Sequence, residues 1–342
     1  MAVLTPLPLA DAQRILDAHG LFQVAEVTPI AAGSVNSNFF VESAKGERVF
    51  VRLYEEQETS GVAYEWALLK ELQGALPLAK RFEGPAPGEL RVAKRCVAVF
   101  DVVEGASISG DALAKAHLEA LGDALARAHE AAERFGWRRR SRFGADGLIE
   151  RLSQIDVRIA RLQDDSARNE SVKRELEVLC AGWPELRARI EAAMRAPLAT
   201  VPMFPVHGDL FPDNALWKGA ELQAVLDWES AADGPAAEDL AVVLLAWTYT
   251  NDFDAPLGRA FLRAYGASRP LGDADWAALA GELTRMAARF TATRIADFFL
   301  RRLEAKAAGD TYLGVYKRYE EFVDRLDKVG ELGQDGLRER LT

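Results

Sequence analysis

The chain has 342 residues, of which 49% are hydrophobic and 27% charged, a composition that is typical of folded globular proteins and excludes a disordered or fibrous chain. Its 42 Lys and Arg residues against 52 Asp and Glu residues leave a net charge of −10, which argues against sequence-independent binding to nucleic acid because that requires a basic surface. At about 150 residues per domain, the length predicts two domains that pack around a cleft.

Neither the cysteines nor the start of the chain indicates a secreted or membrane-bound protein. Cys96 and Cys180 lie far apart and outside any metal-binding spacing, so we expect two free, buried thiols. The N-terminal MAVLTPLPLADAQ lacks the basic start and long apolar stretch of a signal peptide, and the longest charge-free runs, 196–208 and 240–251, are too short to span a membrane. We therefore predict a cytoplasmic protein.

The first hundred residues predict a small domain of mixed helix and sheet, which we place at residues 1–102. The stretch Val24–Tyr54 alternates, is rich in β-branched and aromatic side chains, and has turn signals at Gly33 and Lys45–Gly46, so we expect three antiparallel strands. The other predicted elements are an amphipathic helix at Leu9–His19, a second helix at about Ser60–Gln73, and strands at Leu90–Ala93 and Cys96–Asp101.

From Asp111 onward, apolar residues recur at helical spacing, which predicts a mostly helical second domain over residues 103–342. Pro184 suits the first turn of a helix, so we expect one helix to end before it and another to begin there. One β-like segment, Leu222–Asp227, interrupts the helices, and Val97–Gly105 is the expected hinge between the domains. The predicted helices are 118–133, 148–162, 172–179, 185–195, 236–249, 257–265, 273–303 and 312–329.

Several common site motifs are absent from the sequence. It contains no GxxxxGK[ST] phosphate loop, no GxGxxG after a strand and no GxSxG nucleophile turn. The residues from His129 to Glu133 are close to the zinc motif HExxH, but the second histidine is missing. We therefore interpret His129 as a packing or surface residue.

The most informative segment is HGDLFPDN at 207–214, which is followed by the apolar strand AVLDWE at 224–229. Its Asp on a proline-containing loop, an Asn five residues later and an Asp at the end of a strand supply the groups that phosphoryl transfer needs. These groups are a carboxylate for the proton of the acceptor hydroxyl and hard oxygen ligands for Mg²⁺. Each part alone is typical of ordinary turns and strand ends. Together, in this order and spacing, they favour a kinase.

The motif HxDxxxxN, followed by a strand that ends in Asp, is similar to the catalytic core of the aminoglycoside phosphotransferase and choline kinase group of protein-kinase-like enzymes. The strings HGDLFPDN and DLAVVLLAW, with GSVNSNFFV and VFVRLYE near the N-terminus, most resemble the homoserine kinases of that fold. The resemblance implies an α+β, two-lobed protein-kinase-like fold. It has a small antiparallel-sheet N-terminal lobe and a large, mostly helical C-terminal lobe, with ATP and Mg²⁺ bound between them.

This resemblance implies roles for the residues of the motif. Asp209 corresponds to the catalytic base, and Asn214 and Asp227 correspond to the Mg²⁺ ligands. His207 resembles a structural residue that holds the catalytic loop. Asp239 resembles the acidic residue that braces the same loop; the alternative is a carboxylate favoured at the start of a helix, and both can hold.

The resemblance also implies a nucleotide site in the N-terminal lobe. Arg52 stands where these kinases usually have lysine, and Glu65 on the following helix is its expected ion-pair partner; the alternative is a strand arginine that faces solvent. Phe100 and Val102 are expected near the adenine, beside the hinge. The hairpin that would cover the phosphates contributes Gly33, Ser34, Asn36 and Ser37.

For the acceptor, the resemblance points to Asp213, Glu229, Trp247 and Arg294. Asp213 or Glu229 would pair with an ammonium group, Arg294 would pair with a carboxylate, and Trp247 would shape the pocket. The alternatives are ordinary exposed carboxylates and a solvated basic face of a helix.

Together these residues predict an ATP- and Mg²⁺-dependent O-phosphotransferase that acts on the hydroxyl of a small molecule. Homoserine, converted to O-phosphohomoserine, is the leading acceptor, and another amino alcohol, a sugar or an aminoglycoside is the alternative. Because Arg52 replaces the usual lysine, a nucleotide-binding pseudokinase with a regulatory role is the alternative outside the enzyme class. We expect no nucleic acid or membrane partner, and a monomer or homodimer.

Overall fold

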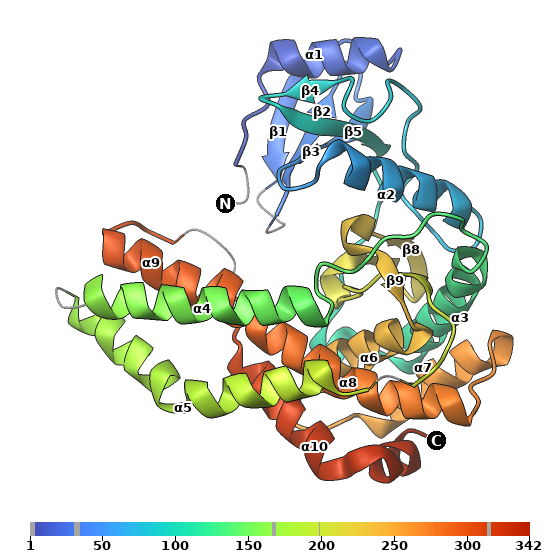
Figure 1. Cartoon of the computed structure of the whole chain (residues 1–342). Coiled ribbons are helices and arrows are strands. Elements are labelled where there is room, and N and C mark those ends of the chain that lie inside the picture. The colour runs from blue at the N-terminus through green and yellow to red at the C-terminus, as the bar shows by residue number, and fades with distance from the viewer. Residues whose placement is uncertain (1–3, 31–34, 166–168, 198, 313–315) are drawn as a thin grey trace.

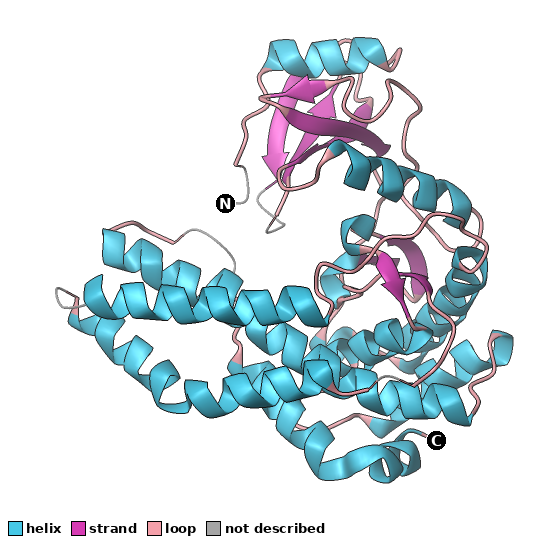
Figure 2. Ribbon diagram, viewed as in Figure 1, coloured by secondary structure: helices cyan, strands magenta, loops and turns pink. Residues whose placement is uncertain are grey.

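The structure is a computed structural model that describes residues 4–30, 35–165, 169–197, 199–312 and 316–342. Figure 1 shows a small lobe, built from a curled sheet with a helix on it, above a larger helical lobe. Figure 2 shows that the larger sheet lies in the small lobe and that the rest of the described chain is mainly helical. The predicted α+β, two-lobed fold is therefore confirmed.

The small lobe is a five-stranded antiparallel sheet in the order β1-β2-β3-β5-β4, with a helix on each face. One face packs through Val51 and Val99 on Ile15 of α1. The other face packs through Tyr54 on Val62 of α2. All the elements predicted for this lobe are present. They are α1 (Leu9–Ala18), β1 (Glu26–Ile30), β2 (Ser37–Glu42), β3 (Arg48–Tyr54), α2 (Thr59–Leu72), β4 (Arg91–Val92) and β5 (Arg95–Asp101).

The link between the lobes is shorter than the predicted hinge of Val97–Gly105. Residues up to Asp101 belong to β5 and pair with β3. The chain is then fastened to the large lobe by two backbone hydrogen bonds between Ala106 and Trp217, with N–O distances of 2.9 and 3.0 Å. Gly105 has a φ of 156°, and a Cβ there would lie 3.1 Å from the Trp217 backbone, so this close approach requires glycine.

The large lobe is built around α6, in which residues Leu240–Leu245 are all buried. This run has no charged side chain, so it is stable only inside a core, and α8 packs along it. The predicted helix 273–303 is interrupted, because α8 passes through the π-helical segment Ile295–Leu300 before α9 begins. The last helix begins at 320 and not at 312. The helices are α3 (Lys115–Ala132), α4 (Ala145–Asp165), α5 (Glu170–Arg195), α6 (Ala236–Trp247), α7 (Ala255–Ser268), α8 (Asp273–Arg294), α9 (Arg301–Ala308) and α10 (Glu320–Leu341).

The large lobe also contains four short strands where the sequence predicts one β-like segment. Two separate pairs form, β6 with β9 and β7 with β8. Strands of this length are too short to show an alternating pattern, and Pro205 and Gly234 conceal β6 and β9 because both residues are depleted in strands. The strands are β6 (Phe204–Val206), β7 (Ala215–Lys218), β8 (Glu221–Val225) and β9 (Ala232–Gly234).

Pro184 lies inside the single helix α5, so the predicted break between two helices is wrong. Asp156 of α4 explains why the helix continues through the proline. Its carboxylate accepts hydrogen bonds from the Trp183 indole at 2.7 Å and from Arg187 at 3.0 Å, which hold the residues on both sides of the proline. Figure 1 shows that α5 bends along its length, as expected for a helix with an internal proline.

Two further observations bear on the class of protein. Within the described ranges, no helix combines the length and the apolar character that crossing a membrane requires. Cys96 and Cys180 are both free thiols, but Cys180 is only partly buried, which differs from the expectation of two buried thiols.

Replacing Pro184 by alanine tests the cost of the proline in α5. We expect Pro184→Ala to raise the free energy of unfolding by about 1–3 kcal/mol, because alanine restores an N–H donor to the helix and removes the clash of the ring with the preceding turn. Urea unfolding followed by circular dichroism measures the change. A lower midpoint would show that the bend at residue 184 is itself needed for the packing of α5 on α4.

Candidate active site

A single buried carboxylate holds the loop that carries HGD. Asp239, in the first turn of α6, accepts hydrogen bonds from the backbone N–H groups of His207 and Gly208, each at 2.7 Å. His129 Nε2 lies 3.0 Å from the same carboxylate, and its Nδ1 lies 2.9 Å from the Tyr265 hydroxyl, so His129 is a packed core residue. Burial would raise the pKa of Asp239, but the hydrogen bonds that it accepts, from His129 first and from the Gly208 N–H, together with nearby positive charge outweigh burial and hold the pKa below its ordinary value.

Two further side chains of the large lobe fix the backbone of this loop. Arg289 of α8 donates to the carbonyl of Gly208 at 2.7 Å and lies 3.3 Å from the carboxylate of Glu238. Trp247, at the end of α6, donates its indole N–H to the carbonyl of Leu210 at 2.8 Å. Trp247 is buried, so it supports the loop from the core, and its predicted part in shaping the acceptor pocket stays a prediction.

The loop places Asp209 next to Asn214 and ties both to the strand before Asp227. His207 Nδ1 accepts the N–H of Asp209 at 3.2 Å, so its Nε2 carries the proton that it donates to the carbonyl of Leu226 at 2.8 Å. The amide nitrogen of Asn214 donates to the carbonyl of Asp209 at 2.7 Å, which leaves the amide oxygen for a ligand. Asp227 has a left-handed backbone, with φ 66° and ψ 52°, which is uncommon for a residue other than glycine.

The carboxyl group of Asp209 is a stronger base than an ordinary aspartate. Burial raises its pKa to about 6, while the charges of Arg289 and Lys317 act in the opposite direction. At neutral pH the group is still mostly ionised and can accept a proton.

A cavity of about 440 Å³ separates the sheet of the small lobe from β7 and β8. Phe50 from the small lobe and Leu216 from the large lobe contribute to its largely apolar walls. Seven of the residues singled out from the sequence line this one cavity. They are Arg52, Glu65, Phe100, Val102, Asp213, Asn214 and Asp227.

Arg52 forms its ion pair across the cavity with Asp227 and not with Glu65. The two charged groups are 2.7 Å apart, and the Arg52 side chain is only 11% exposed, which excludes a solvent-facing arginine. Burial opposes ionisation of Arg52, but the surrounding acidic groups, Asp227 first among them, outweigh it and raise its pKa. Glu65 is buried with one oxygen that has no hydrogen-bond partner in the described structure, and burial raises its pKa to about 8.

The Ser37 hydroxyl, in the hairpin that the sequence assigns to the phosphates, is already hydrogen-bonded within the small lobe. This side chain is fully buried, and its hydroxyl donates to Glu55 at 2.5 Å and accepts two backbone N–H groups of the N-terminal segment. The hydroxyl therefore holds the small lobe together, and a phosphate contact by Ser37 stays a prediction. Gly33 and Ser34 lie outside the described residues.

Glu229 faces the small lobe, not the acceptor side on which the sequence places it. Asn36 donates its side-chain amide to the Glu229 carboxylate at 2.6 Å, and Gln57 donates to the Glu229 backbone carbonyl at 3.0 Å. The carboxylate is buried, and burial together with the charge of Asp227 raises its pKa to about 7. Asn36 and Glu229 therefore join the two lobes next to the Arg52–Asp227 pair.

The two remaining acceptor candidates, Asp213 and Arg294, have different surroundings. Asp213 is exposed and pairs with Lys317 at 3.0 Å. Arg294 is buried and binds Glu321 at 2.6 Å and the carbonyl of Arg318 at 2.7 Å, so its charge is used within the protein. Lys317 is a residue that sequence analysis misses, because a single lysine in a loop carries no pattern, and only the fold places it beside Asp213.

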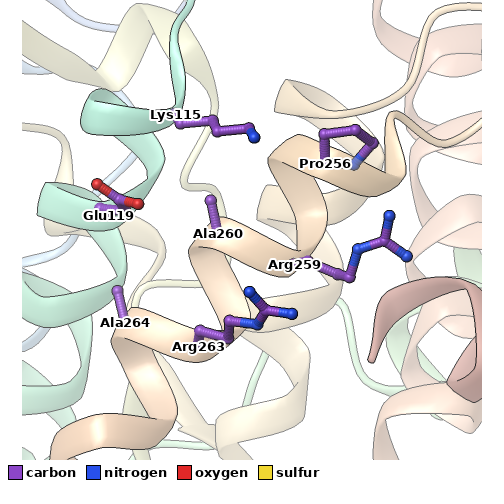
Figure 3. A pocket seen from close by; sticks show the side chains of 7 residues that line it. All are labelled: Lys115, Glu119, Pro256, Arg259, Ala260, Arg263 and Ala264. Carbon is purple, nitrogen blue, oxygen red and sulfur yellow. The ribbon is translucent and has the colours of Figure 1, made fainter.

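A second depression, of about 530 Å³, lies between α3 and α7. Figure 3 shows Lys115 and Glu119 on α3 and Arg259 and Arg263 on α7, with small side chains between them. None of the residues singled out from the sequence lines this depression. The cavity between the lobes is therefore the candidate active site.

Comparison with known proteins finds similarity over most of the chain. Residues 26–281 match the phosphotransferase enzyme family. The chain is 29% identical to the homoserine kinase of Rhizobium etli, over 88% of this chain and 89% of that protein. It is 30% identical to the homoserine kinase of Methylocella silvestris, over 87% of this chain and 89% of that protein. Among solved structures, it resembles amicoumacin kinase hAmiN in complex with AMP-PNP, Ca²⁺ and Ami, with a TM-score of 0.62, 16% identity and 95% of each chain covered.

Buried acids behind the loop that carries HGD make the stability of this region depend on pH. Glu282 of α8 is buried, and burial together with the charge of Glu238 raises its pKa to about 8, although Arg285 and Arg289 act in the opposite direction. Between its ordinary pKa of 4.5 and the raised value, folding binds a proton at Glu282. The contribution of Glu282 to the free energy of unfolding therefore falls as pH rises through this range.

We expect Glu282→Gln, which is neutral at every pH, to raise Tm by a few degrees at pH 8 and by much less at pH 5. Differential scanning calorimetry of both proteins across this range measures the difference. Glu119→Gln, at an exposed site, is the control and should show no such trend. A Tm difference that is the same at both pH values would contradict the explanation from burial.

Proposed function

We propose that this chain, which belongs to the phosphotransferase enzyme family, transfers a phosphoryl group from ATP, with Mg²⁺, to the hydroxyl of a small molecule, and that its acceptor is homoserine. Membership of the family confirms the enzyme class predicted from the sequence. One observation carries the proposal. Asn214 and Asp227 line the cavity between the lobes, and the braced loop holds Asp209 in hydrogen-bond contact with Asn214.

The cavity suits a nucleotide because it offers both apolar and charged walls. Phe100 and Val102 line the part next to the link between the lobes, where a flat, apolar adenine would lie. Arg52 supplies a cation for the phosphates in the same cavity. The solved amicoumacin kinase, which shares this fold, contains AMP-PNP, and this supports the use of ATP.

Asn214 and Asp227 would hold the Mg²⁺. Both offer oxygen atoms, which are the ligands that this ion prefers, and Arg52 contacts only one of the two carboxylate oxygens of Asp227. In the part of the chain that the structure describes, no group of three or more His, Cys, Asp or Glu side chains is arranged to hold a metal ion. Phosphate oxygens and water would therefore complete the ligand set. Bound Mg²⁺ neutralises the charge that develops on the phosphates during transfer.

Arg52 would change partners when the nucleotide binds. Its guanidinium contacts Asp227, the carboxylate that we assign to the metal. Glu65 lines the same cavity and keeps one oxygen without a partner in the described structure, so it offers an alternative hydrogen-bond acceptor for the guanidinium. The planar guanidinium would then also bind phosphate oxygens through two N–H groups.

Asp209 would orient the acceptor hydroxyl and accept its proton. Its pKa of about 6 keeps it ionised at neutral pH and makes it more basic than an exposed aspartate. Its direction is fixed because Asp239, Arg289 and Trp247 all bind the backbone of its loop. Such fixed positioning accounts for a large share of the catalysis of phosphoryl transfer.

The proposed acceptor rests on the relatives and on the motif. Curated proteins named homoserine kinase align with nearly the whole chain at 29% and 30% identity. The strings HGDLFPDN and DLAVVLLAW, which resemble homoserine kinases, contribute Asp209 and Asp239 to the geometry described above.

Replacement of Asp209 and of Asp227 should affect different steps, catalysis in the first case and nucleotide binding in the second. Asp209→Asn should leave the affinity for Mg-ATP nearly unchanged and lower kcat by about 10²–10⁴, because an amide does not accept the hydroxyl proton. Asp227→Ala should instead weaken the binding of Mg-nucleotide, because a ligand carboxylate is lost. Calorimetric titration with a non-hydrolysable ATP analogue and steady-state kinetics separate the two effects. Normal binding and turnover in both variants would contradict the assignment.

Release of ADP across a panel of hydroxyl compounds tests the acceptor. The purified protein is given Mg-ATP with homoserine, choline, ethanolamine, a sugar or an aminoglycoside, and we expect the highest kcat/KM for homoserine. Efficient turnover of another compound, with homoserine inert, would reject homoserine and leave the kinase assignment in place. Nucleotide binding without turnover of any compound would favour the pseudokinase.

A further inference from the structure

We propose that the ion pair between Asp213 and Lys317 is the recognition site for an acceptor that carries both an ammonium and a carboxylate group, as a hydroxylated α-amino acid does. The inference rests on the proposed function, because it names the residues that select the acceptor at the same site. In the structure the two side chains satisfy each other at 3.0 Å. The ammonium group of the acceptor would bind Asp213, and its carboxylate would bind Lys317.

The pair lies beside the proposed base. Asp213 lies in the 3₁₀ turn Pro212–Asn214, which follows Asp209 in the same loop. Lys317 Nζ is 5.4 Å from the centroid of the Phe211 ring, and the backbone N–H of Phe211 donates to the carbonyl of Asp209 at 2.8 Å. Lys317 also lowers the pKa of Asp209 through its charge. An acceptor bound to this pair is therefore held next to Asp209.

The pair is accessible, whereas the arginines near Asp209 are not. The side chains of Lys317 and Asp213 are 32% and 59% exposed, against 3% for Arg289 and 10% for Arg294. Both arginines are bound to the protein, and separating a buried charge from its partner is costly. Of these cations, Lys317 is the one that an acceptor can reach.

The exchange of partners explains why the acceptor would need both charges. Separating an exposed ion pair costs little free energy. An acceptor with both charges then gives each side chain a new partner, the ammonium group for Asp213 and the carboxylate for Lys317. An acceptor with only an ammonium group leaves Lys317 without its partner, and one with only a carboxylate leaves Asp213 without its partner. The pair therefore favours acceptors with both charges over either singly charged analogue.

Arg294 would act on this site through the segment that carries Lys317. It donates to the carbonyl of Arg318 at 2.7 Å and to Glu321 at 2.6 Å, and its guanidinium lies 4.4 Å from the centroid of the Phe322 ring. These contacts fasten the residues after Lys317 to α8. Arg294 is therefore a positioning residue and not the carboxylate ligand that the sequence suggests.

Steady-state kinetics with three acceptors test the proposal. Homoserine has both charges, 3-amino-1-propanol lacks the carboxylate and 4-hydroxybutyrate lacks the ammonium group. Lys317→Met should lower kcat/KM by about tenfold to a hundredfold for homoserine and 4-hydroxybutyrate. It should raise kcat/KM for 3-amino-1-propanol, because Asp213 is then free and no Lys317 is left without a partner. Asp213→Asn should lower kcat/KM for homoserine and 3-amino-1-propanol and raise it for 4-hydroxybutyrate, because Lys317 is then free for the carboxylate. KM for Mg-ATP should stay the same in both variants.

Arg318→Ala is the matched control, because Arg318 is the neighbouring exposed cation and the substitution keeps the backbone carbonyl that Arg294 binds. It should leave kcat/KM unchanged for all three acceptors, and thermal melting checks that every variant is folded. An unchanged kcat/KM for homoserine in both test variants, or an equal loss for all three acceptors, would overturn the proposal.

Rejection of homoserine by the wild-type protein would overturn the proposed acceptor by itself and leave the kinase assignment in place. The pair is then tested on the acceptor that the wild-type protein does use. A second acceptor with both charges, whose kcat/KM falls in both variants, would support recognition by Asp213 and Lys317. If the acceptor that the wild-type protein uses lacks these two charges, the proposed recognition by Asp213 and Lys317 is overturned.

Discussion

The geometry of the site depends on one ionised carboxylate in the interior of the large lobe, that of Asp239. A buried charge is stable only when it is fully hydrogen-bonded, and Asp239 meets this condition with the backbone N–H groups of His207 and Gly208 and the ring of His129. Its place in the first turn of α6 adds a favourable interaction with the helix dipole. Because the rest of α6 is anchored by apolar packing, these bonds turn an irregular loop into a rigid support for Asp209.

Two kinds of contact join the lobes, and they differ in how easily they are exchanged. Leu68 and Leu72 of α2 belong to the main apolar core together with residues of the large lobe, so this side of the small lobe is held by burial. Around the cavity, by contrast, the contacts are polar and include the pairs Arg52–Asp227 and Asn36–Glu229. A polar contact can be replaced by a ligand group of the same charge, whereas the apolar contact stays. Binding can therefore rearrange the cavity without separating the lobes.

The sequence predicts best those contacts and elements that depend on residues close together in the chain. HGDLFPDN brings Asp209 and Asn214 together within five residues, and the alternating strands of the small lobe follow from local pattern. The errors concern residues whose partners are distant. Arg52 pairs with a residue 175 positions away and Glu229 with one 193 positions away, and no local pattern records such partners. Pro184 is a similar case, because the contacts of Asp156 from another helix decide that α5 continues.

Burial also decides which charged side chains around the cavity can bind a ligand. It divides the site into a buried part with Glu65 and Glu229 and an exposed part with Asp213. Glu65 and Glu229 are buried, so desolvation moves their pKa values to about 8 and 7, and changing either disturbs the electrostatics around Arg52 and Asp227. Asp213 has more than half of its side chain in solvent, and a substitution there leaves the hydrogen bonds of Asp239 and Arg289 to the HGD loop in place. A substitution in the exposed part therefore disturbs less of the site than one in the buried part, and the fold alone does not fix which acceptor binds.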